Sequence, residues 1–403
     1  MSMRNADVVV IGAGPAGIGA ATVAARHGLS VVVLDEHPAP GGRLLGQLHE
    51  LPGHGADRWW RGAQVAADMV AEARQAGVEI VTGAAVWGIR PEWEVLVNGA
   101  PFEAVQAPRV LIATGAVEKS VPIPGWTLPG VITAGAGQVF VNVHRVRPGR
   151  KAMLVGVNVL TLTIARELAM AGIEVAGIVL PPPGLLAGDS GNPTRVIASL
   201  GRMAGLAPSA LLRLAGKVFR GREALGAALF PKGGVKVWGI PLMLRQAAVE
   251  VLGDSQVTGV MLEEIGPGGE RTGRRRTVEL DLVCISDGLS PLAELAVPTG
   301  CRFANIPELG GRVPLHGPDM QTTAPGVFVA GNITGIEGAT IAMAQGRVAG
   351  YGLAAHAGRF DLNAAAFREV RAALDEARSG SAIMFMPNLH QGLQAAEKAW
   401  LGI

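Results

Sequence analysis

Cysteine and tyrosine are scarce in this sequence. Its 403 residues include two cysteines, Cys284 and Cys301, and one tyrosine. Two thiols cannot build a disulfide framework, a four-cysteine zinc site or a cysteine-ligated iron–sulfur cluster, and these two are not spaced as Cys-x-x-Cys. Such a low cysteine content is typical of a reducing compartment, so we expect a cytoplasmic protein. The single tyrosine argues against recognition through a tyrosine-rich surface.

Strong net charge and long apolar runs are absent as well. Lys and Arg number 35 and Asp and Glu 33, a formal net charge of +2, which argues against binding nucleic acid by phosphate neutralisation. No window of about 20 residues is apolar without interruption, and the first residues do not form a signal peptide, so we predict no membrane-spanning segment. With 49% hydrophobic and 17% charged residues, the chain is not disordered.

Glycine, in contrast, is abundant, with 57 residues. Its clearest pattern comprises a predicted strand at 7–11, then Gly12, Gly14 and Gly17, a predicted helix at 20–27, and a second strand at 31–34 that ends at Asp35. This order of strand, glycine turn, helix, strand and acid is the dinucleotide-binding fingerprint. Gly12 permits the tight turn, Gly14 lets a pyrophosphate approach the backbone, and Gly17 lets helix and strand pack closely.

Other segments extend this candidate site. The helix N-terminus favours phosphate, and Asp35 is placed to accept the hydroxyls of an adenosine ribose. Gly41 and Gly42 suggest a second close approach to the cofactor, and two further strands end in polar turns at 113–115 and 331–332. The predicted cofactor-binding residues are Gly12, Gly14, Pro15, Ala16, Gly17, Asp35, Glu36, Gly42, Arg43, Ala113, Thr114, Gly115, Gly331, Asn332, Gly338 and Ala339.

A second strand–helix–strand pattern begins at residue 152, but its fingerprint is broken. Gly156 is followed by Asn158 and Thr161 where glycines are required, and Val179 stands where the acid would be. A dinucleotide would lose both its close approach and its ribose acceptor there. We therefore expect a dinucleotide-type domain whose site is lost or takes another ligand.

The predicted fold class is α/β, with two Rossmann-like domains, the second inserted into the first, and a short helical C-terminal segment. The predicted boundaries are 1–116 and 289–356 for the cofactor domain, 117–288 for the second domain, and 357–403 for the tail. Two amphipathic helices are expected at 194–230, as a lid or an intersubunit contact. The helix near 338–352 carries small residues that suit packing on the first glycine-rich helix. We expect no metal site, because Pro and Gly interrupt the segment from His49 to His54.

These motifs together resemble the pyridine nucleotide–disulfide oxidoreductase superfamily, the two-dinucleotide-domain flavoproteins. A closer similarity lies in the segment 113–136, from Ala-Thr-Gly-Ala-Val-Glu-Lys to Pro-Gly-Trp-Thr-Leu-Pro-Gly-Val-Ile-Thr-Ala-Gly-Ala, and in 331–339. These segments look like the α (A) subunits of hetero-oligomeric amino-acid and opine dehydrogenases, a group that includes opine oxidase, hydroxyproline and proline dehydrogenases and hydrogen cyanide synthase. The resemblance covers residues 6–356.

The resemblance implies an FAD-binding redox subunit that works beside a second flavoprotein (β) subunit. Further candidates are FMN at the interface between them and a small [2Fe–2S] protein as a third component. The chain departs from the family pattern in three places. Asn332 replaces the usual aspartate, the second fingerprint is broken, and residues 357–403 contain no cysteine, so we expect no iron–sulfur cluster in this chain. Some relatives hold another adenine nucleotide in the first site, which is the alternative to FAD.

Three functions remain open from sequence alone. The first is a flavin-binding redox subunit of an amino-acid, opine or amine dehydrogenase or oxidase complex. The second is a nucleotide-binding structural subunit without redox turnover, and the third is a stand-alone NAD(P)H-dependent flavin oxidoreductase. No catalytic base and no substrate cage can be recognised, so the catalytic residues and the substrate are not predicted.

Overall fold

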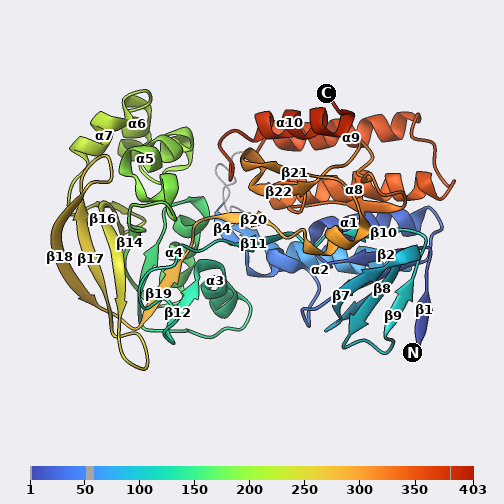
Figure 1. Cartoon of the computed structure of the whole chain (residues 1–403), viewed down its shortest axis with the longest axis horizontal. Coiled ribbons are helices and arrows are strands. Elements are labelled where there is room, and N and C mark those ends of the chain that lie inside the picture. The colour runs from blue at the N-terminus through green and yellow to red at the C-terminus, as the bar shows by residue number, and fades with distance from the viewer. Residues whose placement is uncertain (1, 51–58, 382) are drawn as a thin grey trace. The chain divides into compact units, whose positions relative to one another are not determined.

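The computed structural model describes residues 2–50, 59–381 and 383–403, so His54 of the segment considered for a metal lies outside the described residues. The chain divides into two compact units (Figure 1). Unit 1 comprises Met1–Leu45, Arg61–Val117 and Leu289–Ile403, and unit 2 comprises Gly46–Trp60 and Glu118–Gly288. Three features differ from the predicted boundaries. Segment 46–60 groups with unit 2, whereas Val117 and the C-terminal tail group with unit 1.

Unit 1 is organised around a parallel sheet with strand order β23-β10-β2-β3-β6. The strands are β2 (Val8–Ile11), β3 (Val31–Asp35), β6 (Glu79–Thr82), β10 (Val110–Ile112) and β23 (Val327–Val329). Side chains alternate between its faces. Val8 and Val10 join one core with the helices, and Val9 and Ile11 join another that contains residues of a second sheet. That sheet has the order β1-β9-β8-β7, formed by β1 (Met3–Asn5), β7 (Ala85–Arg90), β8 (Glu94–Asn98) and β9 (Ala104–Gln106).

The helices of unit 1 are α1 (Pro15–Arg26), α2 (Gly62–Gln75), α8 (Ala339–His356), α9 (Ala365–Ser379) and α10 (Leu389–Leu401). The predicted close packing of α8 on α1 is confirmed. A Cβ added at Gly346 would lie 2.2 Å from the carbonyl oxygen of Ala16, so only glycine permits this approach. The remaining strands are β11 (Ala116–Glu118), β20 (Leu289–Pro291), β21 (Phe303–Ile306) and β22 (Gly311–Pro314).

Unit 2 has a larger sheet, with the order β12-β19-β13-β14-β16-β17-β18 and β15 added beside β16. Its strands are β12 (Val131–Thr133), β13 (Lys151–Val155), β14 (Glu174–Leu180), β15 (Val235–Val237), β16 (Ile240–Leu252), β17 (Gly259–Ile265), β18 (Arg271–Glu279) and β19 (Leu282–Ile285). Leu154, Ile178 and Cys284 face a core with α3 (Ala134–Asn142) and α4 (Val159–Met170). The α/β class, with parallel strands at the centre of both main sheets, is as predicted.

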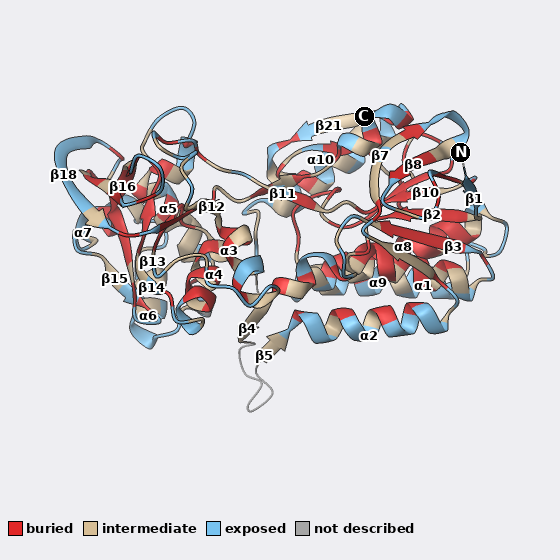
Figure 2. Cartoon of the chain, turned by 90° about the horizontal axis from the view of Figure 1, so that it is seen from below, coloured by how far each residue is buried: buried red, intermediate tan, exposed pale blue. Residues whose placement is uncertain are grey.

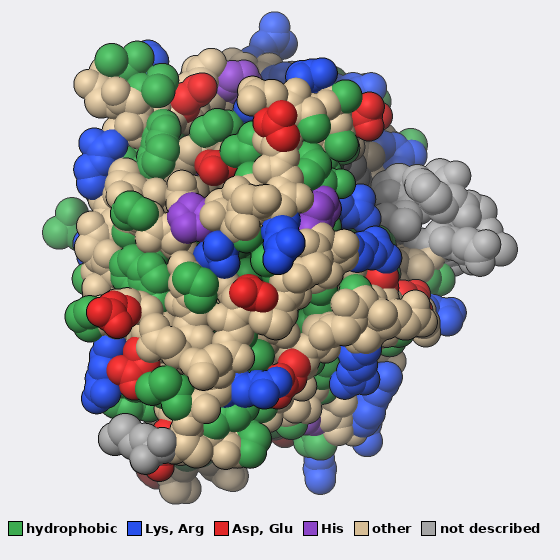
Figure 3. All heavy atoms as spheres, turned by 90° about the vertical axis from the view of Figure 1, so that its right-hand side faces the viewer, with side chains coloured by type: hydrophobic (Ala, Val, Ile, Leu, Met, Phe, Trp, Pro, Cys, Tyr) green, Lys and Arg blue, Asp and Glu red, His purple; other side chains and the backbone are tan. Residues whose placement is uncertain are grey.

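The helical insertion of unit 2 has three α-helices where two were predicted: α5 (Pro193–Arg202), α6 (Ala210–Val218) and α7 (Glu223–Leu229). Strands β4 (Leu48–Glu50) and β5 (Trp59–Arg61) form a separate two-stranded sheet. Buried residues concentrate in the central strands of the two main sheets (Figure 2). On the face shown in Figure 3, cationic and anionic side chains are interspersed among apolar ones. That surface agrees with the near-neutral net charge.

Within unit 2, one carboxylate is buried without a cation among its hydrogen-bond donors. Glu167 on α4 has a side chain only 3% exposed. Its carboxylate accepts hydrogen bonds from the Gln138 amide (2.9 Å), the Asn142 amide (2.8 Å) and the backbone N–H of Leu48 (3.4 Å). Burial raises the pKa of Glu167 from 4.5 to about 7, because these neutral donors offset only part of the desolvation of its charge.

We predict that replacing Glu167 with Gln weakens the pH dependence of stability. A raised pKa means that Glu167 favours folding in its protonated form, so this contribution is complete at pH values below the ordinary Glu pKa and is lost as pH rises through about 7. Between about pH 5 and about pH 8, wild type should lose on the order of 2–3 kcal/mol more unfolding free energy than Glu167→Gln. Urea unfolding at each pH measures this. Glu174→Gln, at an exposed carboxylate, is the control, and parallel profiles for wild type and Glu167→Gln would contradict the prediction.

Candidate cofactor site

The predicted site residues of unit 1 meet at one edge of the parallel sheet. Val329, Ile112, Ile11 and Leu34 lie in register on four adjacent strands, β23, β10, β2 and β3. All four strands are parallel, so the residues that follow them emerge at the same edge. These are the segments that begin at Ala330, Ala113, Gly12 and Asp35. The carboxyl ends of parallel strands are where open α/β sheets bind ligands.

Glycine is required at the three positions of the first turn for different physical reasons. Gly12 has φ +105°, and a Cβ there would lie 2.5 Å from the carbonyl oxygen of Ala113. A Cβ at Gly17 would lie 1.9 Å from the carbonyl oxygen of Gly12. A Cβ at Gly14 would meet nothing within 4 Å. Packing of the protein therefore explains Gly12 and Gly17, whereas Gly14 borders open space at the N-terminus of α1, which fits the approach of a pyrophosphate.

Asp35 lies at the end of β3, beside this turn. Its carboxylate accepts hydrogen bonds from the backbone N–H of Ala13 (2.6 Å) and of His37 (2.8 Å), and its side chain is half-buried. These bonds fix the carboxylate next to the glycine turn. Glu36, the other acid predicted for the site, is exposed.

The Gly41-Gly42 segment lies against the glycine turn. The backbone N–H of Gly41 donates to the carbonyl of Ala13 (2.8 Å), and a Cβ at Gly42 would lie 3.0 Å from the Cα of Gly14. Both glycines have positive φ, +135° and +54°. Next in sequence, the Arg43 guanidinium donates to the carbonyl of Ala116 (2.9 Å), which links this loop to the end of the 113–116 segment.

The turn after β10 is hydrogen-bonded to Leu292, which follows strand β20. The Thr114 hydroxyl donates to the carbonyl of Leu292 (2.5 Å), and the N–H of Leu292 donates to the carbonyl of Gly115 (3.0 Å). Gly115 has φ +77°, a conformation that favours glycine. Two chain segments far apart in sequence are thereby tied at the sheet edge.

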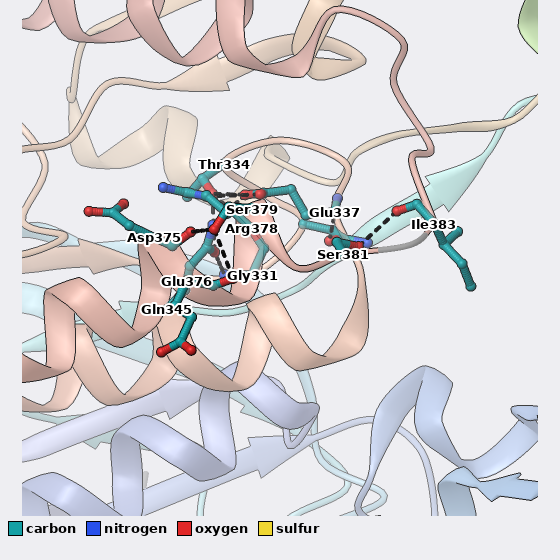
Figure 4. Close-up of polar contacts among 11 residues, drawn as sticks. Gly331, Thr334, Glu337, Gln345, Asp375, Glu376, Arg378, Ser379, Ser381 and Ile383 are labelled. Atoms are coloured by element: carbon teal, nitrogen blue, oxygen red, sulfur yellow. Dashed lines mark hydrogen bonds and ion pairs between the residues drawn. The ribbon is translucent and has the colours of Figure 1, made fainter. Parts of the chain in front are cut away.

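The fourth segment, the loop from Gly331 to Gly338, contains a polar network that sequence analysis missed (Figure 4). The amide oxygen of Gln345 accepts from the N–H of Gly331 (2.7 Å), and its amide nitrogen donates to Glu337 (2.8 Å). The Arg378 guanidinium donates to both Glu337 oxygens at 2.9 Å. Asn332, predicted as a cofactor ligand, accepts from the N–H of Glu337 (3.1 Å). The sequence signal for this network was a polar pair, Glu337 and Gln345, among small apolar residues. Their partner Arg378 lies on the distant helix α9 and could not be inferred from that signal.

The second glycine turn, in unit 2, is closed by a side chain. Gly156 has φ +107°, and a Cβ there would lie 1.7 Å from the carbonyl oxygen of Ser286, so the tight turn is kept. Asn158 takes the place of the middle glycine and caps α4, since its side-chain oxygen accepts from the N–H of Thr161 (2.9 Å). That N–H is one of the groups a pyrophosphate would use. Thr161 and Val179 are fully buried.

The two thiols are also unsuited to redox chemistry. Cys284 and Cys301 are both free and buried. Burial raises the pKa of the Cys284 thiol to about 12 and also raises that of Cys301, so the reactive thiolate form is disfavoured at both positions. Cys284 is a core residue of unit 2.

Two Rossmann-like units, with an open glycine turn and a strand-end acid in the first, are typical of the flavin-dependent oxidoreductases. The family model described as pyridine nucleotide-disulphide oxidoreductase matches residues 6–182, and that described as glucose inhibited division protein A matches residues 314–361. The A subunit of opine oxidase from Rhizobium meliloti is 32% identical over 359 residues, covering 88% of this chain and 72% of that protein. The chain belongs to this family of opine oxidase A subunits and is an FAD-dependent oxidoreductase.

Other relatives agree with this assignment. The HcnB subunit of hydrogen cyanide synthase from Pseudomonas aeruginosa is 29% identical over 86% of this chain and 70% of its own length. Among solved structures, L-proline dehydrogenase from P. horikoshii has a similar fold, with a TM-score of 0.64 at 18% identity over 94% of this chain and 59% of that chain. The chain is therefore shorter than these relatives. None of the helices in the described part of the chain has the length and apolarity needed to cross a bilayer.

We predict that Gly14→Val abolishes flavin binding without unfolding the chain. The added side chain would fill the open space beside the turn, and no protein atom lies within 4 Å of its Cβ. Flavin absorbance per purified chain and thermal unfolding measure the two effects. Gly19→Ala on the same helix is the control, since its Cβ would meet the Met343 carbonyl oxygen at an ordinary 3.4 Å. Wild-type flavin content in Gly14→Val would show that the site is placed wrongly.

Proposed function

We propose that this chain is the flavin-binding redox subunit of a hetero-oligomeric amino-acid, opine or amine dehydrogenase or oxidase. It would pass electrons between an acceptor and a partner flavoprotein subunit. The observation that carries the proposal is the contrast between the two glycine turns. The turn at Gly14 is open, whereas Asn158 caps the helix at the second turn. A chain that holds FAD but lacks an NAD(P)H site needs another source of electrons.

The residues of the first edge fit FAD. The N-termini of α1 and α8 both follow strands of this edge, where their partial positive charge favours phosphate and negative charge. Asp35, fixed by Ala13 and His37, would accept the ribose hydroxyls, and Gly42 and Arg43 would border the cofactor. FAD, when bound, supplies the electron-transfer chemistry, and the protein's role is to bind and orient it. The other predicted residues of the site, which lie between Gly12 and Ala339 in the sequence, are part of this proposal as well.

Relatives support a partner subunit. The A subunit of opine oxidase, the HcnB subunit of hydrogen cyanide synthase and the alpha subunit of sarcosine oxidase are each named as one component of an enzyme. The proposed partner is a flavoprotein β subunit that oxidises the substrate. A cytoplasmic location, an FMN at the interface and a small [2Fe–2S] subunit stay predictions.

Helix α6 offers a surface for that partner. One side of it packs inward, where Leu212 contacts the unit 2 core and Gly216 lies close to Ala204. Three apolar side chains spaced along another side are more than half exposed: Leu211 (75%), Leu214 (58%) and Val218 (52%). Exposed cations accompany them at Arg213 and Lys217. Apolar side chains edged by positive charge fit a partner surface that is apolar at its centre and acidic at its rim.

We predict that NADH does not reduce the flavin of this chain efficiently. The Asn158 cap and the absence of a second ribose acid leave no dinucleotide-binding turn in the described part of unit 2. Stoichiometric NADH added under anaerobic conditions should leave the visible flavin spectrum unchanged, whereas dithionite should bleach it. Dithionite is the control that the flavin is reducible. A visible flavin spectrum of the purified chain separates a redox subunit from one that binds a nucleotide without redox chemistry. Rapid bleaching by NADH would favour the stand-alone oxidoreductase instead.

We also predict that the chain alone does not turn over substrate. Expressed together with the proteins encoded beside its gene, it should form a complex that oxidises an amino acid or opine with an artificial dye as acceptor. Leu214→Asp should reduce co-purification of the partner at least tenfold, because it places a charge in the apolar surface of α6. Leu186→Asp, at an exposed leucine outside α6, is the control. Full specific activity from the isolated chain would refute the hetero-oligomer.

A further inference from the structure

Helix α9, in the C-terminal segment, is anchored on the core of unit 1. Its two buried residues, Phe367 and Leu374, belong to the same core as the strand residues Val8 and Val10 and the helix α1. They are seven residues apart, so they lie on one face of the helix. This docking brings the last turn of α9, with Arg378, to the loop 331–338.

Arg378 meets a carboxylate that is almost entirely buried. The side chain of Glu337 is 2% exposed and that of Arg378 is 23% exposed. The Nε and Nη2 atoms of Arg378 each donate to one Glu337 oxygen at 2.9 Å, a two-pronged pairing that fixes the carboxylate in both position and plane. The loss of such a partner from a buried carboxylate is strongly destabilising.

Glu337 passes this constraint to the backbone of the site. It accepts from the Gln345 amide (2.8 Å), whose oxygen accepts from the Gly331 N–H (2.7 Å) and the Thr334 hydroxyl (3.3 Å). The Glu337 N–H donates to Asn332 (3.1 Å). Figure 4 shows this series of hydrogen bonds from Arg378 on α9 to Gly331, which follows β23 and Ala330 in the chain. Two predicted cofactor-binding residues, Gly331 and Asn332, are thus held through Glu337.

The loop leads directly into the N-terminus of α8. Gly338 precedes the helix, no side chain caps it, and a Cβ at Gly338 would meet nothing within 4 Å. The first turn of α8 therefore borders open space, as Gly14 does at the first turn of α1. A displacement of Glu337 would shift Gly338 beside it, and with it the N–H groups that face this space.

We propose that Arg378 is a positioning residue of the flavin site. By neutralising Glu337, it holds the loop 331–338 in the shape that receives the cofactor. Helix α9 is then part of the cofactor site, although it lies outside the dinucleotide-binding fold. This inference rests on the proposed function, because it assumes that the edge at Gly14 holds FAD.

The test compares FAD affinity and stability in matched variants of the full chain. Arg378→Met removes the cation and should weaken FAD binding at least tenfold, measured by titrating apoprotein with FAD and following flavin fluorescence. Arg378→Lys keeps the charge but not the paired geometry, and should weaken binding several-fold. Arg371→Met, at an exposed position of the same helix, is the control and should bind as wild type does.

A double variant separates positioning from simple loss of stability. Glu337→Gln combined with Arg378→Met leaves no unpaired charge, so it should recover most of the affinity lost in Arg378→Met. Thermal unfolding of the apoproteins is recorded alongside. Wild-type affinity in both Arg378 variants, or a double variant as weak as Arg378→Met, would overturn the inference. If Arg378→Met fails to fold, Arg378→Lys carries the test, and wild-type affinity in it overturns the inference. Failure of the wild-type chain to bind FAD would instead refute the proposed function.

Discussion

The close contact of helix α1 with its neighbours is the constraint on which the site depends. At Gly17 the helix lies so near the carbonyl of Gly12 that a Cβ would be 1.9 Å from it, and at Ala16 it meets Gly346 of α8 nearly as closely. These contacts place the N-termini of α1 and α8 at the same edge of the sheet. A side chain at Gly17 would push α1 away from the glycine turn, and a side chain at Gly346 would push α8 away from α1. Helix dipoles and free N–H groups converge there only because both helices can approach so closely.

The two units show how one turn geometry supports two outcomes. Gly12 and Gly156 have almost the same φ, and each lies against the carbonyl of a neighbouring strand end, Ala113 or Ser286. The difference lies two residues later. Gly14 leaves the helix N-terminus open, whereas Asn158 satisfies it with its own side chain. With the N–H of Thr161 already paired, this helix has less to offer a phosphate, so unit 2 keeps the fold while its turn no longer suits a dinucleotide.

Polar networks hold the segments that the strands do not. In unit 1, a hydrogen-bonded series of Arg378, Glu337 and Gln345 links the loop after β23 to the distant helix α9. In unit 2, Glu167 binds Leu48 and Gln138, and so attaches segment 46–50 to α4. The first network contains a paired cation and the second does not. Burial therefore raises the pKa of Glu167 to about 7, which links the attachment of segment 46–50 to pH.

The sequence by itself determined the class of fold, the first glycine turn and the broken second one. These features are local. The spacing of Gly12, Gly14, Gly17 and Asp35 is set within one strand–helix–strand unit, and each short apolar run predicts a strand from its own residues. It also predicted that Gly331 and Asn332 follow a strand of the site. The helical insertion was predicted with two helices instead of three, because short amphipathic segments leave their ends undefined.

Only the tertiary structure decided which distant side chains meet at the loop after β23. Arg378 lies 41 residues from Glu337, and neither residue carries a motif that predicts the other. Their pairing follows from the docking of α9 on the unit 1 core, which no local pattern encodes. The same holds for Glu167 and Leu48, 119 residues apart. Spacing within a turn is a property of the chain, whereas burial and ion pairing are properties of the packed protein.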